Sequence, residues 1–210
     1  MKRYSAVRIF SAALEKGDVG VFVGKDICKE AFAYDRPGNF YLSRHENMLS
    51  LGLGMAMCSD RRVFLFCDDA YFLRNMSEAA HIAISKCDNI YIVVMVNGIY
   101  TEVGNHPTIF NSLMSPHGFL FNLGFIVHDY KRHFKNMRNP TKEINAIWQK
   151  TRGPLVVLLE VDKGVKKLPE DFPAEKRSID SIMAFIQNEE IPSYNYVPPV
   201  THEKAFDKEE

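Results

Sequence analysis

Two short apolar runs in the middle of the chain each end in a small polar cluster that could do chemistry. Val63–Phe66 leads into Cys67-Asp68-Asp69-Ala70, and Ile90–Val96 leads into Asn97-Gly98-Ile99-Tyr100. Asp68 offers an anionic oxygen and Asn97 a neutral one, and both suit Mg²⁺, which prefers oxygen ligands and often arrives with a phosphate. Gly98 allows the backbone to come close to a ligand. The pair therefore indicates a metal-diphosphate site.

The two apolar runs are the elements that would bring these clusters together. Both are too short to span a membrane and too uniformly apolar for half-exposed strands, so we expect central parallel strands covered by helices on both faces. Residues 77–86 between them carry apolar side chains at helical spacing. A strand-helix-strand unit places both carboxyl ends on one edge of the sheet, where ligands of open α/β sheets bind.

The rest of the sequence predicts an α/β fold, a doubly wound and mainly parallel sheet with helices on both faces. Helices are expected at residues 5–16, 26–34, 47–58, 77–86, 139–150 and 178–187, and strands at 19–23, 40–42, 63–66, 90–96, 124–127 and 155–161. Thr101–Ser115 has no period and contains proline, which is typical of a loop that closes over a site or docks a partner. We expect one domain over residues 1–190 and an extended or disordered tail over 191–210.

Composition narrows the class of protein. The 210 residues are 46% hydrophobic and 25% charged with a formal net charge of zero, which is ordinary for a globular domain and indicates no surface for nucleic acid. No apolar run approaches the roughly 18 residues of a membrane span. The four cysteines lie far apart without a Cys-x-x-Cys pair. They favour reduced thiols in a cytoplasmic protein over a zinc, iron-sulfur or dithiol site.

The layout resembles the diphosphate-binding domain of thiamine diphosphate-dependent enzymes, whose motif is Gly-Asp-Gly, a spacer of about two dozen residues and then Asn-Asn. Cys67-Asp68-Asp69 takes the first position and Val96-Asn97 the second. The similarity is closest to the beta-type half of sulfopyruvate and phosphonopyruvate decarboxylases and covers about residues 1–165. Three further segments resemble that family, namely Asp35–Leu42, Leu51–Ala56 and Gly104–Thr108.

The resemblance implies a ligand set for Mg²⁺. Asp68, the Asn97 side chain and the Ile99 backbone carbonyl would bind the metal, and the Ala70 backbone N–H would contact the diphosphate. An aspartate after a strand also commonly caps a helix or turn, so the residues alone leave that second role open for Asp68.

The remaining site residues follow from the same resemblance. The side chains and backbone expected to border thiamine diphosphate are those of Asp69, Ala70, Gly98, Tyr100 and His45. His106 replaces a glutamine in the family's Gly-Asn-Gln-Pro-Thr loop, and we expect it to act as proton donor or substrate contact.

The sequence departs from the family where the cofactor would lie. Cys67 and Asp69 replace both glycines of Gly-Asp-Gly, Val96 replaces the first asparagine, and Ser43-Arg44-His45-Glu46 replaces the Gly-Ser-Met-Gly turn. An inward-pointing Asp69 would place a second negative charge beside a polyanion, which costs free energy.

The function implied is that of a diphosphate-binding subunit in a two-component decarboxylase or carboligase of a small-molecule 2-oxo acid. Enzymes of this family activate the cofactor with a glutamate from a separate pyrimidine-binding domain. This chain is expected to hold the diphosphate-binding domain only, so an alpha-type subunit would supply the glutamate, in an expected heterotetramer.

Three alternatives stay open. The chain could be a degenerate, non-catalytic scaffold of such a complex, which the substitutions at Cys67 and Asp69 would explain. It could be the beta subunit of a 2-oxoacid:ferredoxin oxidoreductase, which shares the same Asp and Asn positions. It could also be an unrelated doubly wound domain for another phosphorylated ligand, with Asp68 and Asn97 only as turn caps.

Overall fold

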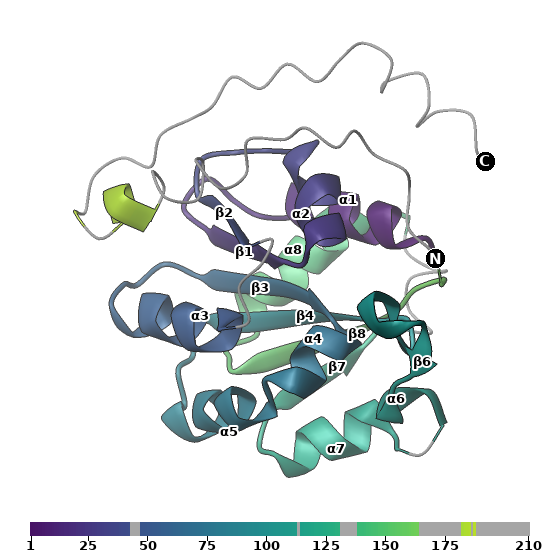
Figure 1. The fold of residues 1–210 in the computed structure, drawn as a ribbon. Coiled ribbons are helices and arrows are strands. Elements are labelled where there is room, and N and C mark those ends of the chain that lie inside the picture. The colour runs from purple at the N-terminus through teal and green to yellow at the C-terminus, as the bar shows by residue number, and fades with distance from the viewer. Residues whose placement is uncertain (43–46, 113, 131–137, 164–181, 186, 188–210) are drawn as a thin grey trace.

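A six-stranded parallel sheet runs through the centre of the molecule in the order β2-β1-β3-β4-β8-β7 (Figure 1). This computed structural model describes residues 1–42, 47–112, 114–130, 138–163, 182–185 and 187. The strands of the sheet are β1 (Val19–Val23), β2 (Asn39–Leu42), β3 (Val63–Asp68), β4 (Ile90–Val96), β7 (Ile126–Asp129) and β8 (Leu155–Glu160). A separate two-stranded antiparallel hairpin consists of β5 (Ile99–Tyr100) and β6 (His106–Pro107).

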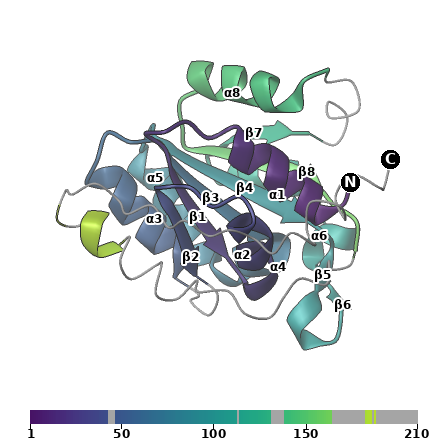
Figure 2. The same cartoon turned by 90° about the horizontal axis from the view of Figure 1, so that it is seen from above.

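Helices connect the strands and lie on both sides of the sheet (Figure 2). They are α1 (Arg3–Ala12), α2 (Lys25–Phe32), α3 (Met48–Met57), α4 (Asp69–Arg74), α5 (Met76–Ser85), α6 (Ile109–Ser112), α7 (Pro116–Asn122) and α8 (Pro140–Lys150), with one 3₁₀ turn, η1 (Thr101–Val103). Parallel neighbours in a sheet need such crossover connections, because the chain must return to the amino edge before each new strand.

The core consists of two layers separated by the sheet. Side chains alternate along β3, so that Val63, Leu65 and Cys67 pack with α3, α5 and α7. Phe64 and Phe66 face the other way and pack with α1, α2 and α8. Every residue of β3 is buried, as expected for a central strand covered on both faces.

The predicted α/β class is confirmed: all neighbouring strands of the six-stranded sheet pair in parallel. β1 and β4 have the bounds expected from the sequence. β7 begins two residues later than expected, because Gly124 adopts a left-handed conformation (φ +99°) after α7. Within the described ranges, no helix combines the length and apolar character needed to cross a membrane.

Three of the described helices and a hairpin lie where the sequence indicated no regular structure. α4 follows Asp68 directly, and α7 begins at Pro116, after its N-cap Ser115, whose hydroxyl accepts a hydrogen bond from the Gly118 N–H at 3.4 Å. The segment 101–115, expected to be a loop, contains η1, β6 and α6. Residues 182–185 are helical. The remainder of the helix expected there, except for Gln187, and the expected tail over 191–210 lie outside the described residues.

Candidate functional site at the carboxyl edge of the sheet

Asp68 and Asn97 lie at the carboxyl ends of adjacent strands. β3 and β4 pair in parallel with Asp68 opposite Met95, and Asn97 follows two residues later. Each of the two side chains is only 8% exposed. The strand-helix-strand unit therefore brings together the acid and the amide that the sequence nominated as metal ligands.

Asp68 caps the first turn of α4. Its Oδ1 accepts a hydrogen bond from the Tyr71 N–H at 2.8 Å, so the helix-cap role that the sequence left open is confirmed. Within the described part of the chain, Oδ2 accepts no hydrogen bond. Burial, with a smaller contribution from the charge of Asp69, raises the pKa of Asp68 to about 6. Ionising this carboxyl group is therefore costly unless a cation lies nearby.

Asp69 is completely buried and connects three parts of the edge. Its Oδ1 accepts a hydrogen bond from the Asn97 N–H at 3.1 Å, and its Oδ2 accepts one from the Thr108 hydroxyl at 2.5 Å. Burial raises the pKa of Asp69, whereas these two hydrogen bonds oppose the rise. The carboxylate thus faces the end of β4. Its expected contact with a cofactor stays a prediction.

The chain turns sharply after Asn97. The Asn97 Oδ1 accepts a hydrogen bond from the Ile99 N–H at 2.8 Å, which closes an Asx turn. Gly98 has φ +73°, and a Cβ atom there would lie 3.1 Å from the Asn111 side chain. The Gly98 carbonyl accepts a hydrogen bond from the Thr108 N–H at 3.0 Å. The positive φ favours glycine here, and a Cβ atom would also require the Asn111 side chain to shift by a few tenths of an ångström.

The hairpin after this turn carries Tyr100 and His106 as an antiparallel pair. Its connection is tied to α4 through Glu102, whose Oε1 accepts a hydrogen bond from the Tyr71 hydroxyl at 3.2 Å. The Glu102 Oε2 accepts one from Arg74 at 3.3 Å. His106 is exposed, so it is available to a ligand or partner; its catalytic role stays a prediction. His45, the other histidine expected at the site, lies outside the described residues.

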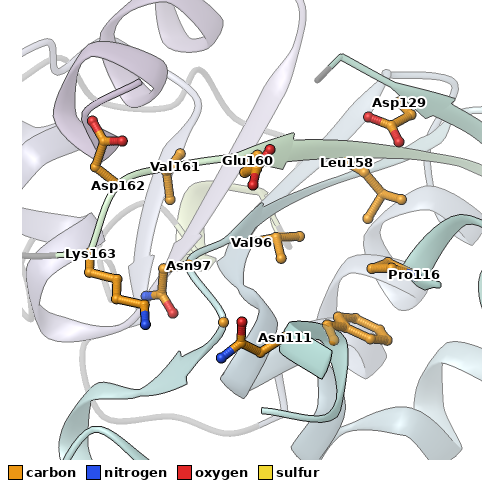
Figure 3. Close-up of a pocket in the computed structure, with 12 residues that line it drawn as sticks. Val96, Asn97, Asn111, Pro116, Asp129, Leu158, Glu160, Val161, Asp162 and Lys163 are labelled. Atoms are coloured by element: carbon orange, nitrogen blue, oxygen red, sulfur yellow. The ribbon is translucent and has the colours of Figure 1, made fainter. Parts of the chain in front are cut away.

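A pocket of about 410 Å³ lies on the β8 side of Asn97, at the carboxyl ends of β4, β8 and β7 (Figure 3). Figure 3 shows Asn97, Asp162 and Lys163 at one end and Asp129 and Pro116 at the other. The lining residues are Val96, Asn97, Gly98, Phe110, Asn111, Pro116, Asp129, Leu158, Glu160, Val161, Asp162 and Lys163. The sequence did not indicate this pocket, because its walls come from five separate segments.

The donor set fits Mg²⁺ better than a softer metal. Over the described ranges, no group of three or more His, Cys, Asp or Glu side chains could hold a metal ion. The predicted site instead offers one carboxylate, one amide oxygen and one backbone carbonyl. Mg²⁺ is commonly bound by one or two protein oxygens, with water and substrate phosphates completing its octahedron. The residues present therefore fit a metal that binds together with a diphosphate.

Comparison with known proteins identifies the family. Residues 27–157 match the family model described as thiamine pyrophosphate enzyme, C-terminal TPP binding domain. This match covers more than half of the chain, and the chain belongs to that family.

A curated relative agrees with this assignment. Sulfopyruvate decarboxylase of Methanosarcina acetivorans is 35% identical over 83 residues, which is 39% of this chain and 21% of that protein. The chain thus matches about a fifth of the length of this relative. The predicted relation to sulfopyruvate decarboxylase and to the diphosphate-binding domain is confirmed.

Solved structures share the fold. Benzoylformate decarboxylase from Polynucleobacter necessarius superposes with a TM-score of 0.62 at 14% identity, over 80% of this chain and 34% of that one. A 2-oxoglutarate:ferredoxin oxidoreductase chain from Magnetococcus marinus superposes with a TM-score of 0.57 at 11% identity. The superposition covers 97% of this chain and 83% of that one. At these identities the matches establish the thiamine diphosphate-binding fold and no more.

Proposed function

We propose that this chain is the diphosphate-binding subunit of a two-component, Mg²⁺-dependent thiamine diphosphate enzyme that decarboxylates or ligates a 2-oxo acid. The observation that carries the proposal is the meeting of Asp68 and Asn97 at adjacent strand ends, in a chain of the thiamine pyrophosphate enzyme family. Similarity to sulfopyruvate decarboxylase supports the decarboxylase class.

In this proposal the metal ligands are Asp68, through the oxygen not used for capping, the Asn97 side-chain oxygen and the Ile99 carbonyl. The Ala70 N–H binds the diphosphate. Thiamine diphosphate, when bound, supplies the electron sink that decarboxylation of a 2-oxo acid requires. The remaining residues expected to border the cofactor are Asp69, Gly98, Tyr100 and His45.

A pyrimidine-binding, alpha-type subunit completes the proposed enzyme and supplies the activating glutamate, in a heterotetramer. The chain spans about a third of the benzoylformate decarboxylase structure that shares its fold. His106 lies exposed on the β5–β6 hairpin at the same edge. It is therefore proposed to meet the substrate or the partner rather than to support the fold.

The second candidate function is that of a scaffold that has lost the cofactor. Two consecutive aspartates, Asp68 and Asp69, are both buried, and Asp69 stands where the family has glycine. Charge repulsion between a diphosphate and two ionised aspartates would weaken binding. This candidate predicts a chain that folds and assembles but binds no thiamine diphosphate.

Isothermal titration of thiamine diphosphate, with Mg²⁺ and with EDTA, distinguishes the two candidates. The titration is made on this chain alone and after mixing with the protein that co-purifies with it. The enzyme proposal predicts binding that requires Mg²⁺ and is lost in Asp68→Ala. Asp88→Ala is the matched control, because Asp88 precedes β4 at the opposite edge and pairs with Arg152 at 2.8 Å. Binding in neither sample supports the scaffold.

A further inference from the structure

Asp69 makes the longest-range connections of any residue at the candidate metal site. Its two hydrogen bonds join residues 28 and 39 positions further along the chain. Both carboxylate oxygens are engaged by protein donors, and the side chain has no exposed surface. Asp69 therefore contacts the Asn97 turn and the Thr108 loop directly.

Thr108 closes the connection from the other side. It is 2% exposed, and while its hydroxyl donates to Asp69, its N–H donates to the Gly98 carbonyl at 3.0 Å. The Asn97 turn is thus held on both sides of the Asn97–Gly98 peptide unit, by Asp69 at the Asn97 N–H and by Thr108 at the Gly98 carbonyl.

The turn needs such an anchor because its own structure is small. β5 and β6 pair over only two residues each, and an isolated two-stranded hairpin is at best marginally stable in water. The Asn97 side chain is itself bound to the Ile99 N–H, so this hydrogen bond links the Asn97 side chain to the Ile99 backbone. A change in the Asn97 backbone is therefore expected to affect both proposed metal ligands.

We propose that Asp69 is a positioning residue that holds Asn97 and the Ile99 carbonyl in place toward Asp68. The role of Asn97 and the Ile99 carbonyl as metal ligands rests on the function proposed above, whereas the hydrogen bonds that Asp69 accepts do not depend on it. In this view the acid that replaces the family's glycine is a functional adaptation and not a sign of a degenerate site. Restoring the glycine, in Asp69→Gly, weakens Mg²⁺-dependent cofactor binding; direct repulsion of the diphosphate by Asp69 would predict tighter binding.

The variants are chosen by hydrogen-bonding capacity. Asp69→Gly leaves the buried Asn97 N–H and Thr108 hydroxyl without their acceptor, and Thr108→Val removes one donor without changing the volume. Losing a buried partner of this kind is expected to lower the affinity about tenfold or more. Asp69→Asn keeps the affinity within about threefold, because its amide oxygen accepts from Asn97 while its NH₂ donates to the Thr108 oxygen.

Asp18 supplies the matched control. It is a buried aspartate that also joins distant segments, accepting hydrogen bonds from the Glu15 N–H at 2.7 Å and from Arg62 at 2.8 Å. It precedes β1 and so lies at the opposite edge of the sheet. Asp18→Asn is expected to lower stability while leaving the affinity for thiamine diphosphate with Mg²⁺ unchanged.

Two measurements test the proposal, and only one needs a ligand. Titration of thiamine diphosphate with Mg²⁺ gives the affinities. Amide hydrogen exchange of the ligand-free chain, followed by NMR, gives the protection of the Asn97 N–H. We expect this protection to fall at least tenfold in Asp69→Gly and to be kept in Asp69→Asn. Thr108→Val is tested by its affinity for thiamine diphosphate with Mg²⁺. The proposal can therefore still be refuted if Asp69→Gly does not fold.

The outcomes separate the two proposals. Unchanged protection of the Asn97 N–H in Asp69→Gly, or wild-type affinity in both Asp69→Gly and Thr108→Val, overturns the positioning role. Absence of Mg²⁺-dependent binding by the wild-type chain, with and without its co-purifying partner, overturns the proposed function instead. In that case the exchange data still decide whether Asp69 holds the Asn97 turn.

Discussion

Replacing Asp68 by asparagine is expected to stabilise the ligand-free protein while abolishing metal binding. Asparagine is as good a helix cap as aspartate, and its oxygen can accept the hydrogen bond that the Tyr71 N–H donates to Asp68. The substitution removes a buried carboxylate. Binding sites often contain residues that are needed for function although they lower the stability of the protein.

The magnitude follows from the pKa of Asp68, which burial raises from 3.8 to about 6. Because the folded state binds the proton more tightly, this group's contribution to stability is complete below the unfolded pKa and is lost as the pH rises through about 6. Two pKa units correspond to about 3 kcal/mol. The free energy of unfolding of Asp68→Asn at neutral pH should therefore exceed that of the wild type by about 1–3 kcal/mol, the lower value allowing for the weaker amide acceptor.

Urea denaturation at several pH values measures this difference. In EDTA the variant should be the more stable protein at neutral pH, and the gap should close by about pH 4. With Mg²⁺ and thiamine diphosphate only the wild type should gain stability, by mass action. A variant that is less stable than the wild type at neutral pH, or a gap that does not change with pH, would show that Asp68 is not a buried, proton-binding carboxyl group.

Three further predictions concern other parts of the molecule. In α3, Gly52→Ala should destabilise by about 1–3 kcal/mol in thermal unfolding, because its Cβ would overlap the leucine side chain of β3. Gly54→Ala, where no described atom lies within 4 Å, should instead stabilise by about 0.5–1 kcal/mol. Removing Arg3 alone in Arg3→Met should cost about 3–5 kcal/mol, since the buried Glu30 carboxylate loses its ion pair with Arg3 at 3.0 Å. Glu30→Leu in the same chain should recover most of that loss in urea denaturation. His106→Ala should change stability by less than about 0.5 kcal/mol but lower the decarboxylation rate of the complex with its partner; an unchanged rate would exclude a catalytic role.

The sequence was most informative about the central strands. The runs at β3 and β4 are uniformly apolar because the strands are buried on both faces, so central parallel strands could be predicted from these runs. Their parallel pairing then determined that Asp68 and Asn97 meet. This part of the site depends on local sequence and one topological rule, which is why it could be predicted.

The parts that could not be predicted depend on contacts between distant residues. Thr108 reaches Asp69 across 39 positions, and nothing in either local sequence indicates the other. α4 was missed because it is six residues long and its cap, Asp68, belongs to the proposed metal site. An Asp69 side chain that points toward a diphosphate would repel it, whereas one that points toward Asn97 supports the turn. The local sequence does not show which orientation the side chain adopts.

The most direct test of the proposed site is a crystal structure of this chain, with its co-purifying partner, grown with thiamine diphosphate and Mn²⁺ in place of Mg²⁺. The anomalous signal of Mn²⁺ locates the metal independently of the protein model. We predict a single peak in contact with Asp68, the Asn97 side-chain oxygen and the Ile99 carbonyl, with diphosphate and water oxygens as the remaining ligands. A metal held elsewhere on the chain, or a cofactor bound without contact to Asp68 and Asn97, would contradict the assignment.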